Sequence, residues 1–210
     1  MHGTPLRKLG RLAAYLLRHP LSVPFYVTRG PFGGRTPLQL QLPWFSLPSI
    51  EFLDRFVTPA MEVFEYGAGG STLYFARRAG RVVSTENDPA WVERVERALA
   101  SGGFGNAEVQ YRPFDFHHAE GFEQSDYLHS IPQRLFDVIV IDSAEEDETM
   151  VRPACFRHAE ARVRPGGIIV VDDAWRYPEL RAVNHAKTWR EFRGIGPCRP
   201  GVTSTDSYFY

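Results

Sequence analysis

The fold of this chain is decided by the stretch Val63-Phe64-Glu65-Tyr66-Gly67-Ala68-Gly69-Gly70-Ser71-Thr72. An apolar strand pattern runs directly into a glycine-rich turn, and a helix pattern follows the turn. Gly67 and Gly69 carry no Cβ atom, so the backbone can approach a ligand closely there. Free N–H groups at the start of the following helix add hydrogen-bond donors. We therefore predict a ligand-binding turn at the carboxyl end of the first strand of an α/β sheet.

Apolar segments recur along the rest of the chain about every 20 to 30 residues. This is the spacing of strand–helix–strand units, which form a mainly parallel sheet with helices on both faces. The five predicted strands are residues 61–66, 81–85, 107–112, 136–141 and 167–171. Helix patterns cover residues 49–57, 89–101 and 150–163. The aromatic segment 204–210 suits a final strand, and residues 189–193 are placed to pair with it across a turn at 194–201.

The first 50 residues form a basic segment ahead of an acidic one. They hold six Lys and Arg and no Asp or Glu, whereas residues 51–210 hold 18 bases and 25 acids. A helix is predicted over Pro5–Arg18, with Leu6, Leu9, Leu12, Ala13, Leu16 and Leu17 on one stripe. We expect this stripe to pack on the domain or on a second subunit, with an anionic membrane surface as the alternative. Residues 20–48, rich in Pro and Gly, read as an irregular connector.

The composition indicates a water-soluble protein with a full core. Hydrophobic residues make up 43% of the chain and charged residues 23%, and no run approaches 18 apolar residues. The two cysteines, Cys155 and Cys198, have no CxxC spacing, which favours reduced thiols in the cytoplasm. The longest apolar run near the N-terminus is residues 12–17, too short for the core of a signal peptide. A formal net charge of −1 gives no general attraction to nucleic acid.

Two acidic residues indicate what the turn binds. Glu86 ends the second predicted strand 19 residues after Gly67, where a carboxylate accepts both hydroxyls of a ribose. Thr72 stands where a dinucleotide fingerprint has Gly or Ala. Glu65 suits a cation better than a pyrophosphate. S-adenosylmethionine has an ammonium group, a ribose and no phosphate, and is therefore the favoured cofactor.

Four motifs together lead to a family. EYGAGGSTLYFA, STENDPAW, FDVIVIDSAEE and RPGGIIVVDDAWRY occur in this order at the ends of predicted strands one, two, four and five. In combination, over about residues 44–210, they resemble the class I S-adenosylmethionine-dependent methyltransferases. The resemblance implies a Rossmann-like, doubly wound, seven-stranded and mainly parallel sheet whose last strand is antiparallel. Residues 1–43 would be a separate basic helix and connector. Ser71 replaces the last glycine of the family's motif, a departure that would change how the turn meets the methionine moiety.

The resemblance also assigns roles to residues. Glu65 and the turn around Gly67 would hold the amino-acid end of the cofactor, Glu86 the ribose hydroxyls, and Asp142 would lie near the methyl group. Asn87 and Asp88 would lie beside the adenine. The candidate cofactor-binding residues are Glu65, Tyr66, Gly67, Ala68, Gly69, Ser71, Glu86, Asn87, Asp142 and Ser143.

The candidate catalytic residues are Asp142 and Asp173. An alcohol or phenol acceptor must lose its proton to a base or a metal. One O-methyltransferase branch holds a divalent metal with an acid after strand four and an Asp-Asn pair after strand five. Here Asp142, Asp172 and Asp173 could hold Mg²⁺. However, the pair after strand five is Asp-Asp in this chain, and the lysine that this branch has after strand four is missing. We therefore favour metal-independent chemistry with Asp142 as the base.

The absence of one motif indicates the type of acceptor atom. Methyltransferases that act on amines of bases or glutamine commonly have Asn/Asp-Pro-Pro-aromatic after strand four, where this chain has Asp142-Ser143-Ala144-Glu145. This favours an oxygen acceptor on a small molecule or glycan precursor, and no nucleic acid. The aromatic residues of the long loop 113–134 either line the acceptor pocket or anchor the loop. Trp44 is either a core residue or a lid over the cofactor.

Two other classes of protein remain as alternatives. A nicotinamide-dependent oxidoreductase would share the sheet, but Glu65 and Thr72 argue against it. A non-enzymatic cofactor-binding protein or membrane adaptor would use the basic helix Pro5–Arg18 as its working part.

Overall fold

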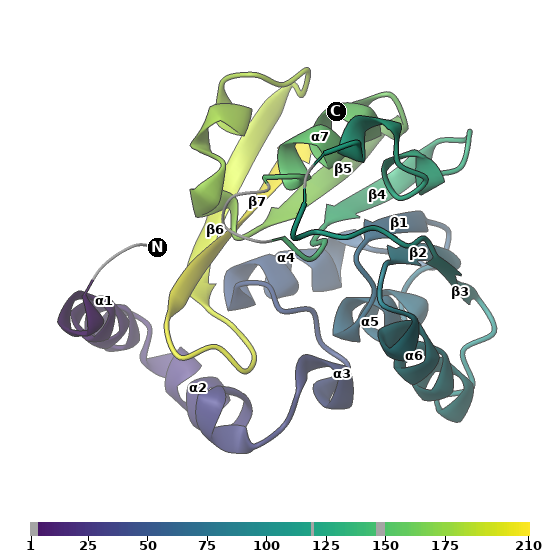
Figure 1. Ribbon diagram of the computed structural model, residues 1–210. Coiled ribbons are helices and arrows are strands. Elements are labelled where there is room, and N and C mark those ends of the chain that lie inside the picture. Colours follow the sequence, from purple (N-terminus) through teal and green to yellow (C-terminus); the bar gives the residue numbers. More distant parts are fainter. Residues whose placement is uncertain (1–3, 119, 146–149) are drawn as a thin grey trace.

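The computed structural model describes residues 4–118, 120–145 and 150–210. Residues 1–3 of the predicted basic segment and Glu146 of the third motif lie outside the described residues. A seven-stranded sheet in the order β3-β2-β1-β4-β5-β7-β6 runs through the molecule (Figure 1). The strands are β1 Glu62–Tyr66, β2 Arg81–Glu86, β3 Ala107–Tyr111, β4 Phe136–Ile141, β5 Val163–Asp172, β6 Thr188–Ile195 and β7 Val202–Phe209. β7 runs antiparallel to both of its neighbours, β5 and β6, and the other strand pairs are parallel, which confirms the predicted fold class.

Helices cover both faces of the sheet because the central strands are apolar on both sides. Leu47–Phe56 (α4), Gly70–Ala76 (α5) and Pro89–Ser101 (α6) pack on one face, and Arg152–Glu160 (α7) packs on the other. Asp88 caps α6 by accepting a hydrogen bond from the Ala90 N–H at 2.8 Å. Successive strand residues alternate between the two layers, so Val63 lies on the α4–α6 face and Phe64 on the α7 face.

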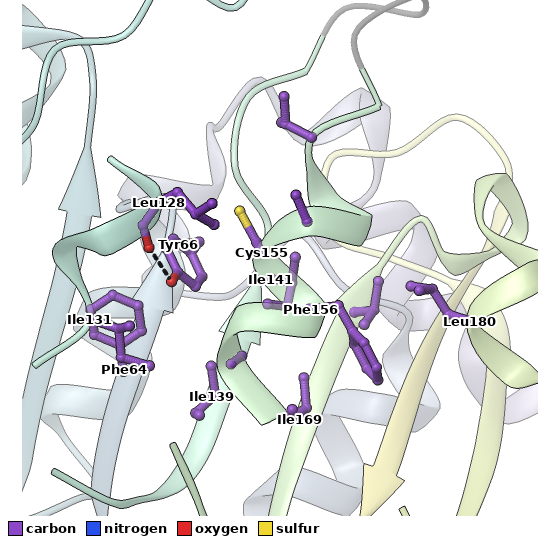
Figure 2. Close-up of a cluster of buried hydrophobic side chains, with 14 of the residues drawn as sticks. Phe64, Tyr66, Leu128, Ile131, Ile139, Ile141, Cys155, Phe156, Ile169 and Leu180 are labelled. Carbon is purple, nitrogen blue, oxygen red and sulfur yellow. Dashed lines mark hydrogen bonds between the residues drawn. The ribbon is translucent and has the colours of Figure 1, made fainter. Parts of the chain in front are cut away.

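The long loop 113–134 is anchored to the core. Phe116, Phe122 and Tyr127 are buried in the cluster on the α7 side, part of which Figure 2 shows. Phe114 packs against the same cluster. Anchoring is therefore confirmed for Phe116, Phe122 and Tyr127, and a role of these rings in an acceptor pocket stays a prediction.

The N-terminal segment is more ordered than an irregular connector. It contains Pro5–Arg18 (α1), Val23–Arg29 (α2) and Pro37–Leu40 (α3). Proline lies in the first turn of each helix, where a missing N–H is tolerated, and Thr36 and Gln39 form a capping box at α3. Single turns of 3₁₀ helix cover Pro20–Ser22, Pro31–Gly33, Phe122–Gln124, Leu128–Ser130, Ala174–Arg176 and Pro178–Arg181.

Only part of the leucine stripe of α1 packs on the domain. Leu12 is buried against Ile195 and Tyr26, with Leu16 beside it. Leu6 and Leu17 are 81% and 83% exposed. Contact of this exposed part with a second subunit or a membrane surface stays a prediction. No helix among the described residues has the length and apolar character to cross a bilayer.

Candidate functional site

A cavity of about 520 Å³ lies at the carboxyl ends of β1, β2 and β4. Its size is within the range of small-molecule sites. The turn after β1, the end of β2 and the loop after β4 form its lining, and Trp44, Trp91 and Arg152 complete it. The structure thus brings eight of the ten predicted cofactor-binding residues to one cavity: Gly67, Ala68, Gly69, Ser71, Glu86, Asn87, Asp142 and Ser143.

The two glycines of the turn have different tasks. Gly67 has φ +99°, and a Cβ there would lie 2.4 Å from the main-chain oxygen of Asp142. Gly67 therefore lets the ends of β1 and β4 approach each other. A Cβ on Gly69 would meet only the Trp91 ring, at 3.9 Å. Gly69 therefore keeps the cavity itself open.

Glu86 is held firmly at the cavity wall. Its Oε1 accepts hydrogen bonds from the N–H groups of Asn87 at 2.8 Å and Asp88 at 3.0 Å. Its Oε2 accepts one from Ala68 at 3.2 Å, which ties the end of β2 to the turn after β1. Burial raises the pKa of Glu86, while these three N–H groups oppose the rise. Each carboxylate oxygen accepts two hydrogen bonds, so Oε2 has room for a ligand hydroxyl.

Glu65 lies below the turn and not in the cavity wall. The residue is completely buried, and its Oε2 accepts a hydrogen bond from the Ser84 hydroxyl at 2.5 Å. Its Oε1 has no hydrogen-bond partner among the described residues. Burial raises the pKa of Glu65 to about 7, although the Ser84 hydroxyl acts to lower it.

Tyr66 faces away from the cavity. Its hydroxyl donates a hydrogen bond to the main-chain oxygen of Leu128 at 2.7 Å, inside the core cluster on the α7 side (Figure 2). Adjacent residues of a strand point to opposite faces, so Glu65 and Tyr66 diverge. The main-chain oxygen of Tyr66 accepts from the Asp142 N–H at 2.9 Å and thereby aligns the ends of β1 and β4. The side chain of Tyr66 therefore does not line this cavity.

Asp142 forms an ion pair inside the cavity wall. Nη2 of Arg152 lies 3.1 Å from its Oδ1. Arg152 also donates two hydrogen bonds to the main-chain oxygen of Ser143 and one to that of Asp172. Burial raises the pKa of Asp142 to about 6, against the lowering effect of Arg152 and Arg199. The buried Ser143 hydroxyl has no hydrogen-bond partner among the described residues.

Asp172 and Asp173 are bound by arginine. Arg199 donates from Nη2 to Asp172 Oδ2 at 2.5 Å and from Nη1 to Asp173 Oδ1 at 2.8 Å. Asp173 Oδ1 also accepts from the Thr203 hydroxyl at 2.7 Å. Burial favours a higher pKa for Asp173, but the Arg199 charge and the Thr203 hydroxyl hold it below its usual value. Asp173 lines a second cavity and not the one that contains Asp142.

This pairing bears on the magnesium alternative. Two guanidinium groups lie among the three carboxylates that would have to bind the metal. Within residues 4–118, 120–145 and 150–210, no three His, Cys, Asp or Glu side chains are grouped as metal ligands. Because the arginines already supply positive charge there, the residues present do not fit a divalent cation.

The sequence prediction missed Arg152, Arg199 and Trp91. Trp91 donates from its indole N–H to the main-chain oxygen of Ala68 at 2.7 Å and so supports the turn. The two arginines come from α7 and from the turn before β7, outside the motifs at the strand ends. One available signal was the cluster of acids itself, since buried carboxylates need cationic partners. Trp44 is 47% exposed and lines both cavities, so its interpretation as a core residue is wrong.

The donor set of the first cavity fits S-adenosylmethionine. Glu86 offers a carboxylate oxygen to a ribose hydroxyl, and the unpartnered Ser143 hydroxyl offers a further hydrogen bond. Asp142 is paired with Arg152 and the pKa of Glu65 is raised to about 7, so the fit rests on the hydrogen-bonding groups of Glu86 and Ser143 and not on a net negative charge.

Solved structures share this fold at low identity. A candidate O-methyltransferase from Klebsiella pneumoniae has a TM-score of 0.63 and 18% identity, over 97% of this chain and 99% of that chain. The cofactor-bound protein Rv0187 from MTB has a TM-score of 0.64 and 22% identity, over 90% and 95%. An O-methyltransferase from Bacillus cereus in complex with SAH has a TM-score of 0.58 and 21% identity, over 92% of this chain and 89% of that chain. These similarities show the fold alone.

A search of curated proteins finds no match to this chain. The family is shown by a comparison of the sequence with family models. A family model described as "Methyltransferase domain" matches residues 64–174, which run from β1 through the loop after β5. The matched residues include the turn after β1, Glu86 and the Asp142–Arg152 pair. The chain therefore belongs to the methyltransferase domain family, among the S-adenosylmethionine-dependent methyltransferases.

Proposed function

We propose that this protein transfers the methyl group of S-adenosylmethionine to an oxygen atom of a small-molecule or glycan-precursor acceptor. The observation that carries the proposal is the Asp142 carboxylate, which lies in the wall of the first cavity with its pKa raised to about 6. A general base works best when its pKa lies near the working pH, and its carboxylate can then take a hydroxyl proton. Two structures with this fold, one described as an O-methyltransferase and one as a candidate O-methyltransferase, agree with an oxygen acceptor.

The cofactor would be held by the residues around the first cavity. Glu86 binds the ribose hydroxyls, Gly69 leaves room for the methionine moiety, and Ser143 donates a hydrogen bond. Glu65 does not reach the cavity wall, and its carboxylate would attract the ammonium group from below the turn when it is ionised.

The chemical step is a displacement at carbon. When bound, S-adenosylmethionine would supply an activated methyl group and leave as S-adenosylhomocysteine. Asp142 would take the proton of the acceptor hydroxyl, whose oxygen would bond to the methyl carbon as the carbon–sulfur bond breaks. Arg152 is a positioning residue that fixes the Asp142 carboxylate and favours its ionised form. Asp173 is not the base in this proposal, because the Arg199 charge and the Thr203 hydroxyl hold its pKa below the usual value and it does not line the first cavity.

The remaining expectations form part of the same proposal. The protein acts in the cytoplasm without binding nucleic acid. Residues 1–43 form a basic accessory segment ahead of the catalytic domain 44–210.

Calorimetric titration with S-adenosylmethionine and with NAD tests the cofactor. We expect binding of the first and none of the second, and the reverse result would favour an oxidoreductase. Transfer from methyl-labelled S-adenosylmethionine to a panel of phenols, sugars and amines tests the acceptor. Label appearing on the amines alone would overturn the oxygen assignment.

A further inference from the structure

A second cavity of about 500 Å³ adjoins the first. It lies between α1 and the start of β7, two elements that are in contact at the β6–β7 end of the sheet (Figure 1). Much of its lining is apolar and includes Leu9, Leu12, Trp175 and Val202. A cavity of this size with mainly apolar walls has the dimensions of a small-molecule site.

Trp44 and Arg199 form the partition between the two cavities. Trp44 lines both cavities, whereas Arg199 lines only the second. The guanidinium carbon of Arg199 lies 4.9 Å from the centre of the Trp44 ring, and its Nε donates to the Trp44 main-chain oxygen at 2.8 Å. Arg199 also pairs with Asp173, so the ring is fixed to the loop after β5. A molecule in the second cavity would therefore be one side chain away from the first.

The rim of the second cavity carries positive charge. The charge of Arg199 is offset by Asp172 and Asp173. Lys8 and Arg11 also line the cavity, and no carboxylate in the described part of the chain pairs with them. The first 50 residues contain no Asp or Glu that could compensate them locally. The cavity thus combines apolar walls with two uncompensated cations at one side.

We propose that the second cavity is the acceptor site and that the acceptor is an amphiphile with an apolar body and an anionic group. This inference rests on the methyl-transfer function proposed above. The apolar body packs on Leu9, Leu12 and Trp175, and the anion lies at Lys8 and Arg11. The reacting hydroxyl passes Trp44 towards Asp142. Helix α1 is therefore part of the acceptor site and sets its preference for anions.

A matched pair of fluorescent probes tests this assignment on the full chain. 1-Anilinonaphthalene-8-sulfonate has an apolar body and a sulfonate, and N-phenyl-1-naphthylamine has the same body without the charge. We expect the sulfonate to bind more tightly than the neutral probe. The double variant Lys8→Gln/Arg11→Gln should reduce that preference by about three- to tenfold and leave the neutral probe unaffected. Equal affinity of the native chain for both probes would overturn the assignment.

A second pair of variants tests the apolar wall. Leu9→Gln should weaken both probes by about tenfold, because Leu9 lines the cavity. Leu17→Gln is the control, since Leu17 lies on the same helix, is 83% exposed and does not line the cavity. Equal effects of the two substitutions would overturn the acceptor site.

Titration with S-adenosylmethionine on the same proteins separates the two proposals. If the native chain fails to bind it, the proposed function fails. If all variants bind it normally but the probes show no preference, only the acceptor assignment fails.

Discussion

Nη2 of Arg152 lies 3.1 Å from Oδ1 of Asp142, and both residues line the first cavity. The same guanidinium donates to the main-chain oxygens of Ser143 and Asp172. One side chain from the start of α7 therefore fixes the loops after β4 and β5 and places a positive charge beside the proposed base.

Loss of Arg152 should destabilise the fold. Arg152→Met leaves the Asp142 carboxylate and two main-chain oxygens without their donor, and we expect a loss of about 3 kcal/mol in urea unfolding. Adding Asp142→Asn should recover part of that loss, because the unpaired charge is then removed. Arg157→Met is the control, since its side chain is 58% exposed and forms a surface ion pair with Glu123. Equal losses from the two single variants would contradict a structural role for the Arg152 pair.

Methyl transfer should depend on the ionisation of Asp142. Its pKa is raised to about 6, and only the ionised form accepts a proton, so kcat/KM should fall about tenfold per pH unit below pH 6. Asp142→Asn should lower kcat at saturating S-adenosylmethionine by about 10²–10⁴. Asp115→Asn, at a 60% exposed side chain, is the control. EDTA should have no effect, and turnover that collapses in EDTA would refute the metal-independent route.

Glu86 should determine the affinity for the ribose. Glu86→Gln keeps the size of the side chain but removes its charge, and we expect calorimetry to show about tenfold weaker binding of S-adenosylmethionine. A 2′-deoxyribose analogue should lose less affinity with the variant than with the native chain. Glu108→Gln, at a 55% exposed side chain, serves as the control. Equal losses of the analogue with both proteins would mean that Glu86 does not contact the ribose.

Gly69 tests the cavity better than Gly67 does. Gly67→Val would clash with the main-chain oxygen of Asp142 and perturb the fold itself, so lost binding would be ambiguous. A Cβ at Gly69 would meet only the Trp91 ring, so Gly69→Leu should extend into the cavity and block the cofactor while circular dichroism and the melting temperature stay close to native. Gly105→Leu, with no atom within 4 Å of its Cβ, should bind normally. Normal binding by Gly69→Leu would place the cofactor elsewhere.

Glu65 should make stability fall as pH rises. Burial raises its pKa from 4.5 to about 7, so the folded state binds a proton in this window that the unfolded state has released. The contribution of protonated Glu65 to the free energy of unfolding is fully present below pH 4.5. It is lost as the pH rises through 7, a change of about 3 kcal/mol. Glu65→Gln should therefore be more stable than the native chain at pH 8 but not at pH 4.5, as urea unfolding would show. The 67% exposed Glu93 gives a control in Glu93→Gln, and parallel pH profiles for native and Glu65→Gln proteins would contradict the prediction.

Much of the fold could be predicted because it depends on local patterns. The apolar segments recur at the spacing of strand–helix–strand units, and Asp88-Pro89 begins α6 as predicted. The glycines of the turn after β1 indicated a ligand site, and the turn does line the first cavity. The helices within residues 20–48 were missed, because frequent Pro and Gly read as loop even where Pro begins a helix.

The amino-acid sequence by itself determined which strand ends carry functional side chains. An acid and glycines lie at the end of β1, an acid at the end of β2, and acids at the ends of β4 and β5. Only the tertiary structure decided which of these side chains meet. β1 is buried on both faces, so no alternation of buried and exposed residues shows that Tyr66 turns into the core. Arg199 is 26 residues from Asp173 along the chain, and only the antiparallel return of β7 beside β5 brings them together. Charge pairing between distant segments is a property of the folded sheet, because no local pattern specifies it.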